Sequence, residues 1–125
     1  MELLLDTHVL LWWLADDGRL PANARSAIAD PDHRALVSAA SIWEISIKRA
    51  IGRLRSPTNL LAVLDECGFE VMPITAAHAE LAGALPRHHD DPFVRMLVAQ
   101  ATIEGLTIVT FDERMTAYRV SRLGP

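Results

Sequence analysis

Four acidic residues stand far apart in the sequence at positions where a fold could bring their carboxylates together. Asp6 and Asp112 each follow a short apolar run, and Glu44 and Asp91 each lie near the beginning of a segment with helical spacing. Clustered carboxylates repel one another unless a cation neutralises them. Because the ligands would all be oxygen atoms, and no Cys or His spacing indicates zinc, the chemistry that fits is the binding of Mg²⁺ or Mn²⁺.

Each acid, taken alone, also has a simpler structural interpretation. Three of the four occupy positions where a helix N-cap is expected, which is a common use of Asp. Glu44 forms the Ser-x-x-Glu pattern of a capping box with Ser41, and Lys48 follows four residues later, where a helical ion pair can form. Capping roles alone do not explain why all four acids would lie in one crevice, because acids gathered there need a neutralising cation.

The stretch 88–101 supplies one of these acids and a well-defined helix start. Pro92 suits the first helical position, so Asp91 is the expected N-cap, and apolar residues then recur at helical spacing. His88 and His89 precede this start. They could contact a phosphate, although a place on the loop surface is the commoner use of such histidines.

The elements that would position these residues alternate between short apolar runs and segments of helical spacing. The expected strands are 3–5, 35–38, 69–72 and 106–109, and the expected helices are 7–15, 22–29, 41–51, 56–64, one capped by Thr75, one from Asp91 to about Gly105, and one after Asp112. This alternation predicts an α/β fold, with a parallel sheet of four to five strands flanked by helices on both faces. The carboxyl ends of such strands converge on one crevice, where the four acids would meet.

One expected helix carries more apolar surface than a single stripe can bury. Residues 10–14 are all apolar and include two tryptophans. Either part of this helix faces something beyond the chain's own core, or later elements of the chain cover it. Both interpretations stay open from the sequence.

The overall composition indicates one domain spanning residues 1–125, since half of the residues are hydrophobic. The net charge of −4 argues against a nucleic-acid partner, but Lys48, Arg49, Arg53 and Arg55 form a local cationic patch. A single cysteine fits a reducing compartment. The beginning of the chain lacks a basic leader and no apolar run approaches the length of about 20 residues that crosses a bilayer, so we expect a cytoplasmic protein without a membrane partner.

Four segments also carry a family resemblance. They are 4–8, 41–45 together with Lys48, 89–93 running into Arg95 and 99–101, and 109–112. In this order and spacing they resemble the PIN domain, specifically the VapC-type toxins of bacterial toxin–antitoxin pairs. The resemblance spans nearly the whole chain. It implies a Mg²⁺-dependent endoribonuclease that cuts RNA, is held inactive by a cognate antitoxin protein and forms a homodimer.

The resemblance also implies an acidic constellation, which falls on Asp6, Glu44 and Asp112 plus one further acid between the Phe and the Arg of the Asp-Pro-Phe motif. That position is Val94 here. Valine cannot ligate a metal or accept a proton. Either the site is impaired or Asp91, one helical turn earlier, substitutes; we favour impairment because Asp91 already has an N-cap role.

For the intact site we expect metal-assisted phosphodiester hydrolysis, with Asp6, Glu44 and Asp112 holding the ion and a metal-activated water attacking the phosphate. The cationic patch would steer the RNA backbone. One alternative is a catalytically inactive PIN module that binds an antitoxin. Another is a receiver-like phosphoacceptor domain, which fits less well because Asp6 stands alone after its strand and no Lys follows Arg55.

Overall fold

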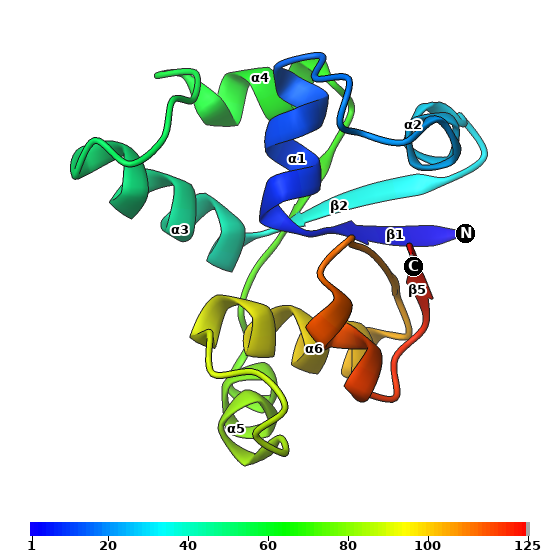
Figure 1. Cartoon of the computed structure of the whole chain (residues 1–125), viewed down its shortest axis with the longest axis vertical. Helices are drawn as coiled ribbons and strands as arrows, with labels where there is room; N and C mark the ends of the chain where they lie inside the picture. The colour runs from blue at the N-terminus through cyan, green and yellow to red at the C-terminus, as the bar shows by residue number, and fades with distance from the viewer. Residues whose placement is uncertain (125) are drawn as a thin grey trace.

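The sheet has five parallel strands in the computed structural model, which describes residues 1–124. In chain order they are β1 (Glu2–Leu5), β2 (Arg34–Ser38), β3 (Glu70–Met72), β4 (Thr107–Val109) and β5 (Arg122–Leu123). Their order across the sheet is β3-β2-β1-β4-β5 (Figure 1). Strands β2 and β3 follow β1 on one side of the sheet, and β4 and β5 then lie on its other side. The topological switch point therefore lies between β1 and β4.

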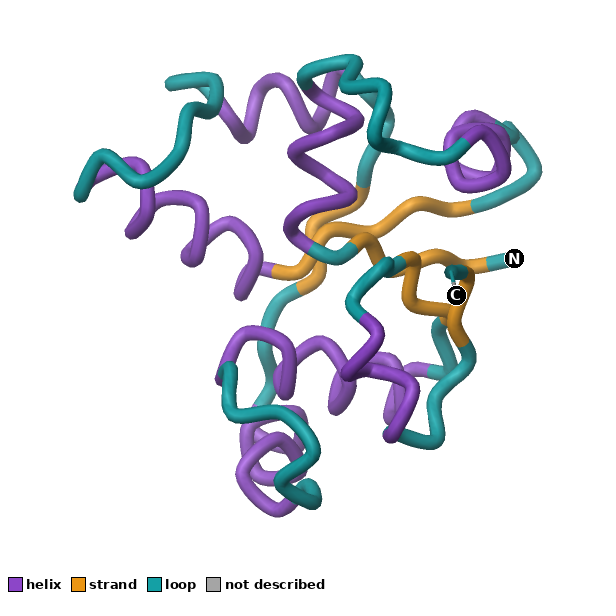
Figure 2. The backbone as a smooth tube through the Cα atoms, in the orientation of Figure 1, coloured by secondary structure: helices purple, strands orange, loops and turns teal. Residues whose placement is uncertain are grey.

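Helices cover both faces of this sheet (Figure 2). On one face lie α1 (Thr7–Leu14), α2 (Ala22–Ala29), α3 (Ala39–Ala50) and α4 (Leu60–Glu66); on the other lie α6 (Pro92–Glu104), with α5 (Ala76–Ala84) packed against it, and the short 3₁₀ helix η1 (Glu113–Ala117). The predicted α/β class and the covering of both faces are confirmed. None of the helices in residues 1–124 is long and apolar enough to cross a membrane.

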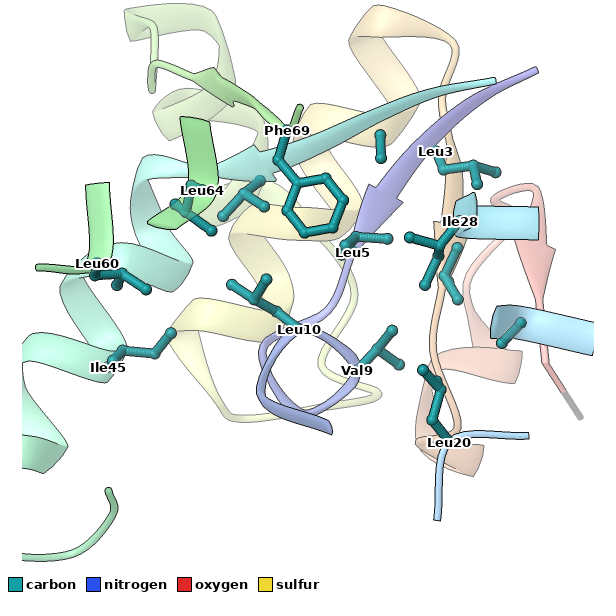
Figure 3. Packing of buried hydrophobic residues seen from close by; sticks show 14 residues of the cluster. Leu3, Leu5, Val9, Leu10, Leu20, Ile28, Ile45, Leu60, Leu64 and Phe69 are labelled. Atoms are coloured by element: carbon teal, nitrogen blue, oxygen red, sulfur yellow. The ribbon is translucent and has the colours of Figure 1, made fainter. Parts of the chain in front are cut away.

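The alternation of side chains along the strands explains the two cores. Leu3 and Leu5 point into the core under α1, whereas Leu4 points into the core under α6, and all three are fully buried. A strand buried on both faces must be apolar at every position, as this one is. Figure 3 shows the first core, where Phe69 and Leu64 pack beside Leu5.

Several element boundaries differ from the predicted ones. The predicted capping box of Ser41 and Glu44 is wrong, because the N-cap of α3 is Ser38, whose hydroxyl accepts the Ala40 N–H (3.0 Å). Helix α3 therefore begins at Ala39, two residues before the predicted start. Helix α4 begins at Leu60 and not at residue 56. The Arg49 guanidinium donates to the Pro57 carbonyl (2.8 Å), which holds the preceding segment as a loop.

The apolar segment 10–14 is mostly covered by the chain itself. Leu10 is fully buried, and the next four residues are half-buried and pack against the first core. Trp13 lies 5.9 Å from Phe69 and Trp12 lies 6.3 Å from Phe111, measured between ring centroids. These tilted ring pairs cover part of each tryptophan, and residues 11–14 stay partly exposed.

Candidate active site

Asp6 lies at the switch point, immediately after β1. Its N–H donates to the Val109 carbonyl (3.0 Å), which continues the β1–β4 pairing by one residue and sets Asp6 beside Thr110. One carboxylate oxygen accepts the Val9 N–H (2.9 Å) and so caps α1; the other accepts the Thr110 hydroxyl (2.6 Å). Burial raises the pKa of Asp6, and these hydrogen bonds offset only part of that effect.

Thr110 connects Asp6 to the loop that carries Asp112. While its hydroxyl donates to Asp6, the same oxygen accepts the Asp112 N–H (3.1 Å). The Asp112 carboxylate caps η1 by accepting the Arg114 N–H (3.0 Å). Two acids separated by more than a hundred residues are therefore joined through one buried hydroxyl.

His89 holds Asp112 from the other side. Its Nδ1 accepts the Asp91 N–H (3.1 Å), so the proton of the neutral ring resides on Nε2, which donates to Asp112 Oδ2 (2.9 Å). The exposure of His89 is only 4%. Burial opposes ionisation of Asp112, but the hydrogen bonds from His89 and Arg114 outweigh it and lower the pKa of that carboxyl. The prediction that His89 lies on the loop surface is wrong, whereas His88 is exposed.

Glu44 reaches the same edge of the sheet from α3. It is buried, and its Oε1 accepts the hydroxyl of Thr7, the residue next to Asp6 (2.6 Å). Its Oε2 accepts from the Lys48 ammonium (2.5 Å), which confirms the expected helical ion pair. A cation of the chain itself therefore already lies against this carboxylate.

Asp91 has the N-cap role expected from the sequence. Its Oδ1 accepts the N–H groups of Phe93 (2.8 Å) and Val94 (3.4 Å) at the start of α6. Val94 is half-buried and packs against the core under α6. The Phe93 ring meets Trp43 of α3 edge-on at 5.5 Å, which fixes this end of α6 against α3.

A pocket of about 300 Å³, the acidic pocket, brings two of the predicted acids to one surface. Its walls include Asp6, His8, Trp12, Phe111, Asp112 and Arg114. Glu44 lies outside this set, turned toward Thr7 and Lys48. Within residues 1–124, no three Asp, Glu, His or Cys side chains are grouped closely enough to hold a metal ion in their present conformations.

The acids nevertheless fit a divalent ion by their chemistry. Asp6 and Asp112 offer hard oxygen ligands to one pocket, and burial of Asp6 opposes its negative charge, which a bound cation would favour. Glu44 could join them only by turning away from Lys48 or through an intervening water. The three-ligand metal site stays a prediction.

The sequence indicated no role at this site for Thr7 or Thr110, and for His89 it offered contact with a phosphate or a place on the loop surface, not the bond to Asp112. The two threonines each stand next to, or two residues from, a predicted acid. Pairing of β1 with β4 would have placed Thr110 beside Asp6, but the register is not visible in one sequence. His89 stands two residues before an N-cap, and only the tertiary fold turns its ring toward Asp112.

Comparison with known proteins shows the family of this chain. Residues 3–122 match the family described as PIN domain. The chain belongs to the PIN-domain family, so the predicted family is confirmed, and it is by family a nuclease. A receiver-like domain is excluded, also because receiver sheets have the order 2-1-3-4-5 and this one does not.

Among curated proteins, the chain is 34% identical over 122 residues to "Ribonuclease VapC22" of Mycobacterium tuberculosis (strain ATCC 25618 / H37Rv), covering 95% of this chain and 93% of the relative. Among solved structures, VapBC2 from Rickettsia felis bound to a promoter DNA fragment aligns with a TM-score of 0.72 and 12% identity, covering 99% and 98% of the two chains. DNA-bound VapBC from Salmonella typhimurium aligns with a TM-score of 0.69 and 17% identity, covering 99% and 98%. These two likenesses support the fold.

Proposed function

We propose that this chain is a metal-dependent endoribonuclease toxin that hydrolyses RNA phosphodiester bonds and pairs with an antitoxin protein. The observation that carries the proposal is the Asp6–Thr110–Asp112 linkage at the switch point of a PIN-domain sheet. Catalytic groups of parallel α/β sheets gather at such points. The relative named a ribonuclease covers nearly the same length of chain.

The residues that would hold the ion, Mg²⁺ with Mn²⁺ as a substitute, are Asp6, Asp112 and Glu44. When bound, such an ion supplies a water of lowered pKa and stabilises charge that develops on the phosphate. Asp6 is fixed for this role by two hydrogen bonds, from Val9 and Thr110. Fixed ligands reduce the reorganisation that binding and catalysis require.

The chain's own residues prepare the site in two further ways. His89 donates its Nε2 proton to Asp112 and thereby helps to keep that carboxyl ionised. Trp12 and Phe111 line the acidic pocket beside the two acids. Their rings exclude water from part of the pocket wall, which strengthens the electrostatic interactions inside.

Val94 stands where the family resemblance requires a fourth acid, and we propose that the activity of this chain is impaired for that reason. Asp91 does not replace that acid in the proposal, because its Oδ1 accepts two N–H groups of α6. A second candidate function follows: an inactive PIN module that binds an antitoxin. The Lys48 ammonium on Glu44 favours it, since that cation already neutralises one of the acids.

Two partner surfaces belong to the proposal. The half-buried residues 11–14 of α1 offer an apolar surface for an antitoxin segment. Along α3 and its C-cap, three exposed apolar residues recur every fourth position: Trp43 (62% exposed), Ile47 (38%) and Ile51 (62%). We assign this stripe to a homodimer contact. With RNA as substrate and a single exposed cysteine, we place the protein in the cytoplasm.

The test restores the missing acid. Val94→Asp should increase cleavage of single-stranded RNA in Mg²⁺ or Mn²⁺ by about 100-fold, an effect typical of one electrostatic group in an active site. Val94→Asn, similar in shape without the charge, is the matched control and should not gain activity. The double variant Asp6→Asn with Val94→Asp should return to the starting level.

The same variant has an expected effect on stability. In this proposal residue 94 belongs to the acidic cluster, so adding a carboxylate there should lower the free energy of unfolding of the metal-free protein by about 1 kcal/mol, and saturating Mg²⁺ should recover much of it. An unchanged cleavage rate for Val94→Asp, with thermal melts that coincide with and without metal, would contradict the nuclease assignment.

A further inference from the structure

A second pocket shares a wall with the acidic pocket. It has a volume of about 470 Å³, and we call it the basic pocket; its lining includes Thr7, His8, Trp12, Lys48, Arg53 and Arg55. His8 and Trp12 line both pockets. A molecule that extended from one pocket into the other would therefore pass directly over these two rings. The volume lies within the usual range of small-ligand sites.

Some positive groups of the basic pocket form ion pairs and others do not. Lys48 is bonded to Glu44, and Arg19 at the rim is bonded to Asp17. Arg53 and Arg55 are exposed, and neither takes part in an ion pair within the described part of the chain. The pocket consequently presents two guanidinium groups to a ligand, and guanidinium groups recognise phosphate by paired hydrogen bonds.

The wall between the pockets is aromatic. The Trp12 ring is half-buried and is held by Phe111 on the acidic-pocket side, with centroids 6.3 Å apart, and by His8 at 6.4 Å. The Arg19 guanidinium, which is bonded to Asp17, lies over the indole at 5.6 Å on a side chain that is 72% exposed. Nucleic-acid bases stack on such rings and on guanidinium planes.

We infer that the basic pocket binds the nucleotide next to the scissile phosphodiester, in a single-stranded segment of RNA. Its base stacks on Trp12, and its phosphate contacts Arg53 and Arg55. This inference rests on the proposed ribonuclease function, and it adds a subsite that orients the substrate strand. It also explains how a chain with a net charge of −4 can bind a polyanion, since the positive groups gather beside the acids.

RNA fits this pocket better than an antitoxin segment. Leu11, Ala15 and Leu54 also line the pocket, so an apolar peptide segment would contact part of it and would compete with RNA for Trp12. The feature that favours RNA is the pair of arginines, Arg53 and Arg55, which have no ion pair in the described residues and lie in the same pocket as the aromatic Trp12. That combination is the usual one for single-stranded nucleic acid, in which the backbone follows positive charge and the bases stack.

The experiment measures binding in EDTA, where metal-dependent cleavage does not interfere. The probes are a fluorescein-labelled ten-nucleotide single-stranded RNA and an abasic strand of the same length. Trp12→Leu should weaken binding of the RNA about tenfold and leave the abasic strand unchanged, because only the bases stack. Trp12→Phe, which keeps an aromatic ring, should retain most of the affinity.

Variants of the two arginines should affect binding differently from variants of Trp12. The double variant Arg53→Gln with Arg55→Gln should weaken binding of both probes and reduce the slope of log affinity against log salt by about 1.4, close to 0.7 per lost contact with single strands. Arg119→Gln, an exposed arginine on the far side of the sheet, is the matched control and should change neither. Thermal melts verify that every variant is folded.

The outcomes separate the two proposals. RNA binding that all pocket variants retain would overturn the subsite while the ribonuclease proposal stands on its own cleavage assay. Loss in Trp12→Leu that is equal for RNA and abasic strands would overturn base stacking. No RNA binding by the unmodified chain would overturn the subsite as well, and with no cleavage by Val94→Asp it would overturn both.

Discussion

At the scale of single residues, Asp6 is the carboxylate whose surroundings most oppose its charge. Burial raises its pKa above the ordinary value of Asp, so the folded protein binds this proton more tightly than the unfolded chain does. Ionisation of Asp6 therefore lowers the free energy of unfolding as the pH rises through the pKa of the folded state. If catalysis needs the ionised Asp6, the metal-free protein is less stable at neutral pH until a cation binds this carboxylate.

We expect Asp6→Asn to stabilise the metal-free protein at pH 7, because Asn can still cap α1 while the buried charge is gone. The gain should shrink as the pH falls and disappear below about pH 3.9, where both states of the original protein are protonated. Urea unfolding across this range measures it. Mn²⁺ should then stabilise the original protein only; a variant that is less stable at pH 7 without metal would refute this account of Asp6.

His89 is expected to act as a positioning residue for Asp112. His89→Ala removes the Nε2–H donor from Asp112 and leaves the Asp91 N–H without its acceptor, which should cost about 2 kcal/mol of stability. The pKa of Asp112 should rise toward the ordinary Asp value. Carboxyl ¹³C titration measures that pKa, and an unchanged value in His89→Ala would show that the ring does not hold this charge.

What the sequence predicted at this scale was the identity of the acids and their cap roles. Asp6, Asp91 and Asp112 all cap helices, as expected. Their partners could not be predicted. Thr110 and His89 reach the site only because β4 lies beside β1 and because the loop before α6 folds inward, and neither fact leaves a local pattern.

At the scale of elements, the sequence predicted the helices and strands that have a long run of buried apolar residues. It failed for segments that are very short or lie at the surface. β1 and α6 follow directly from an apolar run and from an Asp-Pro start that ends at Gly105, a residue with φ of 68°. β5 has two residues, too few to show alternation, and it exists because it pairs with β4. The segment after Asp112 forms the short 3₁₀ helix η1 and not an α-helix.

The start of α6 allows a direct test of whether Asp91 substitutes for the acid missing at position 94. Asp91→Asn keeps a good cap, so its stability should change by less than about 0.5 kcal/mol, whereas Asp91→Ala should lose about 1 kcal/mol. Any residual RNA cleavage by the original chain should be unaffected by Asp91→Asn. Abolition of that cleavage by Asp91→Asn would instead identify Asp91 as a catalytic acid.

At the scale of the whole molecule, the distribution of surface groups matters more than their totals. The acidic net charge alone argues against a nucleic-acid partner, yet Arg53 and Arg55 face one pocket beside Asp6 and Asp112. The sequence located the cationic patch but not the position of its residues Lys48, Arg53 and Arg55 in a pocket next to the acidic one. That adjacency depends on α1, which contributes His8 and Trp12 to both pockets.

The apolar stripe on α3 gives a prediction about assembly. Ile47→Asp should convert the proposed dimer into a monomer, because a charge in the middle of an apolar contact loses its hydration without a partner. Ser46→Asp, an exposed neighbour on the same helix, is the control and should remain a dimer. Light scattering after size exclusion measures the mass; a dimer that survives Ile47→Asp would place the contact elsewhere.

We propose that Asp6 and Asp112, far apart in the sequence, form one cation site with Glu44 near it. The most direct measurement is the anomalous difference density of a crystal of this chain soaked in Mn²⁺. We predict a peak in the acidic pocket, within ligand distance of carboxylate oxygens of Asp6 and Asp112. A crystal at saturating Mn²⁺ with no peak there, or with its only peak away from both carboxylates, would show that these two acids do not form a cation site.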